Sequence, residues 1–221
     1  QRERLNNSIT AAIRQSLNPA EIFAIAVKEL GNVLDVSRCI IYRCTDADAD
    51  ALIKHEYRQA HINSLEGTAW PLKNNPLYQW VKSKQATLTI DDVNGETERD
   101  IDLSTVLSRI RRWQIRSCLL VPLVHKSRLL GMIELHLDDS ASHRWNDDEI
   151  ALSEASANQL SVALIQAEAY ANLEDLNQQL ADLERTRSNL IAITGHELRT
   201  PLSTIRVCLE RLLTAPDMEA A

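Results

Sequence analysis

The sequence predicts an α+β fold, in which helices flank an antiparallel sheet. Residues 115–125 and 129–137 are apolar, branched stretches around the turn Lys126-Ser-Arg-Leu, a spacing that favours a β-hairpin. Segments with helical spacing precede the first strand-like stretch and follow the last one. Hairpin connections with helices before and after them indicate an antiparallel sheet, since parallel strands need longer crossovers.

Two helices are expected before the sheet. Apolar residues recur at helical spacing over residues 5–17, and Asn18-Pro19 ends this helix. A second helix begins around Pro19, because proline suits a first turn, and runs to Leu30 before Gly31.

The expected sheet elements follow in order along the chain. Strands are predicted at 38–43, at 52–57 after the acidic turn 46–50, and at 87–90. Short helices are predicted at 76–85 and at 103–113. Gly131, in the second strand of the hairpin, predicts a close backbone approach or a bulge.

Composition bears on partners and compartment. The net charge of −7 and the pI near 5.4 argue against nucleic acid as a partner. The apolar run 118–124 is far shorter than the ~20 residues that cross a bilayer, so no membrane span is expected. The polar start does not resemble a signal peptide, which favours a cytoplasmic location with four reduced cysteines.

Three phrases resemble a GAF domain over roughly residues 15–165. They are Ile115-Arg-Ser-Cys-Leu-Leu-Val-Pro-Leu, Leu130-Gly-Met-Ile-Glu-Leu-His and Arg144-Trp-Asn-Asp-Asp-Glu-Ile. GAF domains are sensory modules that pack helices on one face of a sheet and often hold a ligand on the other. The resemblance implies a GAF-like sensor domain at 1–165, including the N-terminal helix, and leaves its ligand unknown.

Around Trp113-Gln-Ile-Arg116 the chain is similar to cyanobacterial bilin-binding GAF photoreceptors. Those proteins attach the pigment through a Cys-His pair, whose places here hold Thr105 and Val106, so covalent attachment at this point is not expected. Cys39 and Cys44 should face opposite sides of a strand, which disfavours a shared metal or iron–sulfur site. A photoreceptor or redox sensor stays open as an alternative.

The histidines and aromatic residues of the sensor region do not by themselves predict a ligand site. His55, His125 and His136 lie on or beside predicted strands, and no pair has a metal-binding spacing such as His-x-x-x-His, so no metal site is expected. A ligand site could also be lined by one loop histidine and four aromatic residues, although scattered aromatics more often belong to the core: His61, Trp70, Tyr78, Trp80 and Trp113.

The segment His196-Glu-Leu-Arg-Thr-Pro-Leu202 lies within a helical pattern over 190–221. An apolar stripe recurs there at steps of four and three: Leu198, Leu202, Ile205, Leu209 and Leu212. At about 100° per residue, His196 lies ~200° from Leu198 and should point away from the stripe. Pro201 cannot donate to the Glu197 carbonyl, so the helix should be bent or open there, and Gly195 softens the same turn.

The phrase Leu190-Ile-Ala-Ile-Thr-Gly-His-Glu-Leu-Arg-Thr-Pro-Leu202 resembles the H-box of sensor histidine kinases. The resemblance implies that His196 accepts the γ-phosphoryl group of ATP, that Glu197 polarises the imidazole, and that Thr200 helps to dephosphorylate a response regulator. A neutral imidazole is nucleophilic near pH 7, and a carboxylate on its N–H raises its basicity. Two positions depart from the common pattern, Leu190 in place of Phe and Gly195 in place of Ser.

No glycine-rich nucleotide loop follows His196, and the chain has only five glycines. We therefore expect no ATP binding here and only the first helix of a dimerisation domain. The partners would be a response regulator and the ATP-binding domain, with ATP and Mg²⁺, of a parent kinase.

Residues 166–189 predict a signalling helix that dimerises. Leucines keep the 3-4 alternation of a parallel coiled coil, with Arg187 as the polar seam residue: Leu173, Leu176, Leu180, Leu183 and Leu190. Thr194 and Leu198 then follow in two steps of four, which resembles a stutter and predicts a hinge. The alternative is a GAF-containing dimeric interaction protein whose His196 is never phosphorylated.

Overall fold

The computed structural model describes residues 7, 9–11, 16, 18–45, 47–95, 101–138 and 143–214, with side chains to residue 210. The chain forms two compact units, Gln1–Ala169 and Tyr170–Ala221. The elements are α2 (Pro19–Val33), β1 (Arg38–Arg43), β2 (Asp50–Leu52), β3 (His55–Arg58), β4 (Ala69–Pro71), α3 (Pro76–Lys84), β5 (Leu88–Ile90), α4 (Leu107–Arg112), β6 (Ser117–His125), β7 (Arg128–Leu137) and α5 (Asp147–Thr214).

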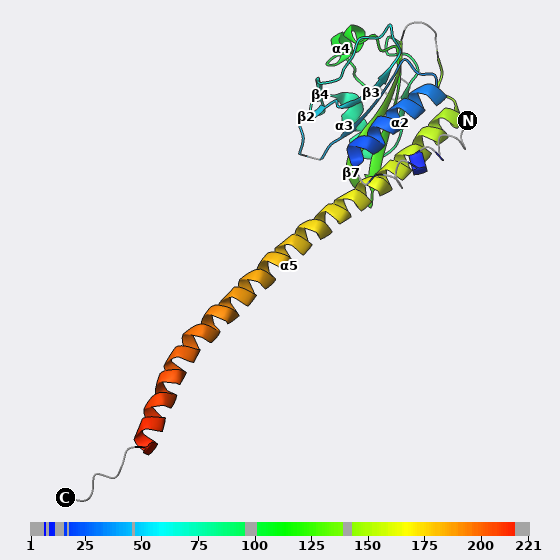
Figure 1. The fold of residues 1–221 in the computed structure, drawn as a ribbon. Coiled ribbons are helices and arrows are strands. Elements are labelled where there is room, and N and C mark those ends of the chain that lie inside the picture. Colours follow the sequence, from blue (N-terminus) through cyan, green and yellow to red (C-terminus); the bar gives the residue numbers. More distant parts are fainter. Residues whose placement is uncertain are drawn as a thin grey trace, which may run out of the picture. The chain divides into compact units, whose positions relative to one another are not determined.

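The first unit is built on an antiparallel sheet of five strands in the order β3-β1-β7-β6-β5, beside a two-stranded pair of β2 and β4. Figure 1 shows α2 and the start of α5 beside this sheet, with α3 and α4 elsewhere around it. The predicted α+β class is confirmed.

Two apolar cores lie on the two faces of the sheet. One joins α2 and the start of α5 to Cys39, Ile41 and their neighbours, and the other joins α3 and α4 to Ile40, Tyr42 and Cys44. Successive residues of a strand point to opposite faces, which explains how β1 serves both cores. The prediction that Cys39 and Cys44 face opposite sides is confirmed.

Local side chains start the helices. The Asn18 side chain accepts a hydrogen bond from the Ala20 N–H, and Pro19 occupies the first turn of α2. The Asn75 side chain caps α3 in the same way. At the start of α5, the Asn146 Oδ1 accepts from the Glu149 N–H at 3.0 Å and the Glu149 Oε2 accepts from the Asn146 N–H at 3.0 Å. These reciprocal bonds form a capping box, so α5 begins at a defined residue.

The hairpin of β6 and β7 turns on two residues. Lys126 and Ser127 have φ values of +46° and +63°, as a type I′ turn requires, so the turn is shorter than the predicted Lys126-Ser-Arg-Leu. The register shifts after Leu123, and a Cβ at Gly131 would lie 2.3 Å from the Tyr42 backbone oxygen. The predicted close backbone approach at Gly131 is therefore confirmed.

Replacing Gly131 with alanine is expected to destabilise the first unit by about 2 kcal/mol, because β1 and β7 must separate to admit the methyl group. Urea unfolding followed by tryptophan fluorescence measures this loss. Gly67→Ala provides the contrast, since φ there is +78° but nothing lies within 4 Å of the added Cβ. A loss at Gly131 no larger than the one at Gly67 would contradict the steric explanation.

Three predicted elements differ from the structure. The expected strand 52–57 is split at Lys54, because Ile53 bonds to Thr68 and Gly67 beside β4 whereas β3 pairs with β1. The expected helix 103–113 is only α4, since the Asp102 carboxylate accepts from the Ser104 N–H and holds a turn before it. The expected helix 5–17 lies largely outside the described residues, of which 9–11 are helical.

Within the first unit, one carboxylate of α5 contacts two strands of the sheet. The Glu168 Oε1 lies 2.6 Å from Arg43 at the end of β1, and its Oε2 lies 3.4 Å from Arg128 at the start of β7.

Among the described residues, no helix combines the length and apolar character that a bilayer-crossing segment needs.

Candidate functional site

The predicted phosphoacceptor residues lie in the second unit, on α5. His196, Glu197 and Thr200 are all exposed in the single chain, and the Thr200 hydroxyl donates to the His196 backbone carbonyl at 3.3 Å. The Thr200 side chain therefore occupies the turn that follows the imidazole. No described residue covers the ring, so a second molecule can reach it.

The two helix-weakening residues flank His196. A Cβ at Gly195 would meet nothing within 4 Å, so glycine is not required there for space. The helix continues across Pro201, and the predicted opening does not appear as a break in α5. Proline still has no N–H, so the Glu197 carbonyl lacks its usual helical donor one turn after the histidine.

A second candidate site lies inside the first unit, between the sheet and α4. A cavity of about 20 Å³ is lined by residues of several elements: Trp70, Asn75, Leu77, Val106, Arg109, Ile110, Ile115, Cys118, Leu120, Glu134 and His136. This volume holds about one water molecule. A drug-sized ligand needs a site of roughly 300–1,000 Å³. In this conformation the chain's own side chains fill the space.

A carboxylate forms one wall of this cavity. Glu134 is 2% exposed, and its Oε1 accepts hydrogen bonds from the Tyr42 hydroxyl at 2.5 Å and from the Trp70 indole N–H at 3.1 Å. Its Oε2 lies 3.2 Å from Nε2 of His136, which is equally buried. The other ring nitrogen, Nδ1, is buried without a partner among the described residues. Burial lowers the pKa of His136, and Glu134 opposes that shift. Burial also raises the pKa of Tyr42.

A buried ion pair supports the wall next to the cavity. The Arg38 Nε donates to the Glu56 carboxylate at 2.9 Å, across the β1–β3 pair. Its other nitrogens donate to the backbone carbonyls of Trp113 at 3.2 Å and Asn63 at 2.6 Å. Burial lowers the pKa of the Arg38 guanidinium, while Glu56 acts in the opposite direction. Arg38 thereby connects the end of α4 and the loop before β4 to the sheet.

The structure separates the pocket residues that the sequence suggested. Trp70 lines the cavity, whereas His61 is half-exposed and pairs with Asp138 at 2.8 Å. Tyr78 is buried in the core, and the partly buried Trp80 and Trp113 pack against this core.

At the positions of the pigment-attaching pair, Val106 lines the cavity and Thr105 is exposed. Cys118 is the thiol that lines the cavity, and burial raises its pKa well above the usual range, which keeps it protonated and unreactive. Among the described residues, no three His, Cys, Asp or Glu side chains come together as a possible metal site.

Sequence reasoning missed Glu134, Arg38 and Glu56. One signal was available for the first, since Glu134 and His136 are two residues apart on a predicted strand and must share a face. The structure shows that β7 is buried on both of its faces, and this cannot be read from the sequence of the strand alone.

Stability is expected to fall as the pH is lowered below 6.5. Because burial lowers the pKa of His136, the unfolded chain binds a proton near pH 6.5 that the folded chain does not bind. The loss is at most about 1.4 kcal/mol per pH unit for this group. Urea unfolding between pH 8 and 5 measures it, and His136→Gln should make the dependence shallower. The half-buried His55, whose pKa burial also lowers, accounts for part of the remaining slope. An identical slope in wild type and variant would contradict the assignment.

Comparison with known proteins gives one family match and several longer relatives. The GAF domain model matches residues 18–164. The circadian input-output histidine kinase CikA of Synechococcus elongatus is 29% identical and covers 93% of this chain, and that of Thermosynechococcus vestitus is 27% identical and covers 92%. In both cases the match is 31% of the relative, so the chain spans about a third of their length.

Solved structures share the fold of the first unit. The phycocyanobilin-bound GAF domain from a cyanobacterial phytochrome superposes with a TM-score of 0.65 at 24% identity, covering 77% of this chain and 97% of that one. The GAF domain of a phosphoenolpyruvate-protein phosphotransferase from Coxiella burnetii gives 0.61 at 16% identity, covering 77% and 96%. At these identities the similarity shows the fold alone, and the bound pigment and the enzyme activity are those of the compared proteins.

Proposed function

This chain belongs to the GAF domain family, and on that premise we propose that it is the sensory and phosphoacceptor portion of a two-component sensor histidine kinase. The observation that carries the proposal is the exposed imidazole of His196 within Gly-His-Glu-Leu-Arg-Thr-Pro, on the helix that leaves the GAF domain. The two relatives named CikA, both histidine kinases, support it, since their matches cover more than nine-tenths of this chain.

In the proposed reaction a neutral imidazole nitrogen of His196 attacks the γ-phosphorus of ATP. The new N–P bond forms as the bond between that phosphorus and the β,γ-bridging oxygen breaks, and ADP leaves. Glu197 accepts a hydrogen bond from the other ring nitrogen and takes up the proton that the imidazole releases. ATP and Mg²⁺ would be held by the ATP-binding domain of the parent kinase.

The phosphoryl group then passes to an aspartate of a response regulator, and His196 is regenerated. We assign Thr200 to the later removal of that group, where its hydroxyl, one turn from His196, would help to position a water molecule. The regulator and the ATP-binding domain must reach the same imidazole in turn, which its exposure permits. The proposal locates the protein in the cytoplasm, where ATP and response regulators occur.

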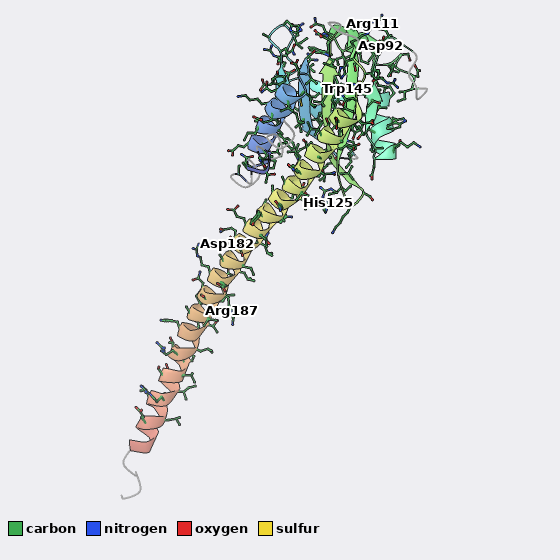
Figure 2. All side chains as sticks on the ribbon, turned by 90° about the vertical axis from the view of Figure 1, so that its right-hand side faces the viewer. Asp92, Arg111, His125, Trp145, Asp182 and Arg187 are labelled. Carbon is green, nitrogen blue, oxygen red and sulfur yellow. The ribbon has the colours of Figure 1, made fainter. Side chains whose placement is uncertain are left out.

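A homodimer is the proposed functional unit. Every described side chain from 170 to 210 is exposed in the single chain, and Asp182 and Arg187 project from this part of α5 in Figure 2. The seam leucines are between 52% and 66% exposed, and they form an apolar stripe that no described part of the chain covers: Leu173, Leu176, Leu180, Leu183 and Leu190. A second copy buries such a stripe in a parallel coiled coil. The step from Leu190 through Thr194 to Leu198 would then be the hinge through which the sensor acts on His196.

The deciding experiment is phosphoryl transfer to this chain. We expect incubation with labelled ATP, Mg²⁺ and a purified histidine-kinase ATP-binding domain to give acid-labile, base-stable label at His196, mapped by mass spectrometry. Absence of label under conditions where the intact parent kinase is labelled would refute the proposal and favour a dimeric interaction module.

The fold similarity to bilin-bound GAF domains supports a second candidate, a photoreceptor. The small cavity and the threonine at position 105 weigh against it. A visible absorption spectrum of the purified protein separates the two, because bilin, haem and iron–sulfur groups are coloured.

A further inference from the structure

An open groove lies where the pairing of β1 with β3 stops. β1 pairs with β7 as far as Arg43, whereas its pairing with β3 extends only to Ile41. Before Lys54 the chain pairs with β4 instead. A groove of about 390 Å³ is lined there by the ends of these strands and the start of α2. Unlike the cavity between the sheet and α4, it has a volume within the range of roughly 300–1,000 Å³ that small-molecule sites occupy.

The charged side chains of this groove have one sign. Among the described residues that line it none is acidic, whereas three are basic: Arg43, Lys54 and His55. The whole chain has 31 acidic residues against 24 lysines and arginines, so the lining departs from the average charge of the protein. Burial and the neighbouring Lys54 both lower the pKa of His55, although Glu66 opposes them. An anion placed among these groups would relieve their mutual repulsion.

The groove also has an apolar lining, supplied by three elements: Pro19, Phe23, Ile41 and Leu52. Leu52 is 52% exposed although it is a large apolar residue. The rings of Phe23 and His55 meet edge to face with their centroids 5.6 Å apart, so the apolar and basic parts are adjacent. An inorganic anion would leave the apolar part in water, and a hydrocarbon would leave the charges unpaired. A ligand that suits both parts has an anionic group on an apolar body.

Arg43 belongs to the groove and also contacts α5. Its Nη2 lies 2.6 Å from Oε1 of Glu168, the carboxylate that contacts both β1 and β7. The guanidinium of Arg43 therefore already holds one carboxylate, a group whose geometry matches its own. A second carboxylate, bound in the groove, would compete with Glu168 for the same guanidinium. Binding would then weaken one contact between the sheet and the helix that leads to His196.

We propose that this groove binds a small carboxylate with an apolar tail, whose carboxylate contacts Arg43 and Lys54 and displaces Glu168 from Arg43. Binding here requires no phosphoryl transfer to His196, so it is tested on this chain alone. By linkage, the ligand weakens the Arg43–Glu168 contact by the same factor by which that contact weakens ligand binding.

Titration of the full chain with sodium hexanoate, followed through the NMR signals of the histidine rings, tests the site. We expect saturable binding with a Kd of about 1 mM and a shift of the His55 signal. Acetate, which lacks the tail, and 1-hexanol, which lacks the charge, should each bind at least about tenfold more weakly. A shift of the His136 signal in place of His55 would put hexanoate in the cavity between the sheet and α4 and overturn the proposal.

Variants at exposed positions separate the groove from general charge effects. Lys54→Glu should weaken hexanoate binding about tenfold, and Leu52→Ser about threefold. Lys84→Glu, at the exposed end of α3 outside the groove, is the matched control and should stay within about twofold of wild type. Equal losses in the two lysine variants would show a response to net charge alone and overturn the site.

The competition for Arg43 has its own test. Glu168→Gln should tighten hexanoate binding by about two- to fivefold, since an exposed ion pair opposes binding by no more than that. Unchanged affinity in Glu168→Gln would overturn the competition. Tighter binding of a capped Leu-Glu-Leu-Glu peptide than of hexanoate would assign the groove to a protein segment and overturn the small-molecule proposal.

Discussion

Asparagine in place of His196 is expected to abolish acid-labile phosphorylation of the chain, a loss of at least about 10³-fold, because the second unit has no other histidine. The side chain is exposed, so the variant should keep the helix content of the wild type. The measurement is incorporation of acid-labile label from ATP, in the intact parent kinase and in this chain supplied with an ATP-binding domain. Label that persists at the wild-type level would remove His196 from the mechanism.

The matched control is His125→Asn, at the end of β6 in the other unit (Figure 2). It should be labelled like the wild type. Glu197→Gln keeps the shape of the side chain but not its charge, and should slow labelling by about 10²-fold if the carboxylate takes up the imidazole proton. A rate for Glu197→Gln within twofold of wild type would show that the proton leaves by another route.

Neutralising Glu56 is expected to destabilise the GAF domain by about 3–5 kcal/mol, which would unfold much of the protein near 37 °C. The side chains of Arg38 and Glu56 are 1% and 3% exposed, so Glu56→Gln leaves a buried guanidinium without its counter-charge. Chemical denaturation followed by tryptophan fluorescence reports it directly, since all four tryptophans lie in the first unit.

The contrasting variant is Glu168→Gln. It weakens the ion pairs with Arg43 and Arg128, whose side chains are more than half exposed. Ion pairs of that kind contribute less than about 1 kcal/mol. If both variants lower the free energy of unfolding by the same amount, the buried Arg38–Glu56 pair stabilises the domain no more than an exposed ion pair does.

The fold was largely predictable where short-range patterns decide it. The β6–β7 hairpin, α2 and α3 each carry their own signals in turn residues, caps and periodicity. Residues 52–57 were wrongly predicted as one strand. Their sequence carries no signal that pairing with β4 ends before Lys54 and pairing with β1 begins after it. That change depends on pairing with β1 and β4, which lie before and after this segment in the sequence.

The two candidate sites differ in the same respect. His196, Glu197 and Thr200 are adjacent on one helix, so their motif could be read directly from the sequence. Arg38 and Glu134 could not, because a charged residue on a strand ordinarily predicts a solvent-facing position. Their burial is made favourable by partners brought in from elsewhere, such as the Trp113 carbonyl, 75 residues from Arg38.

The double contact of Glu168 has a mechanical consequence. One oxygen is engaged by the last residue of β1 and the other by the first residue of β7, from two adjacent strands. Both contacts therefore hold the same turn of α5 against the place where β1 ends and β7 begins. Both arginine side chains are more than half exposed, so salt screens the two ion pairs. Raising the ionic strength should weaken them without unfolding the sheet.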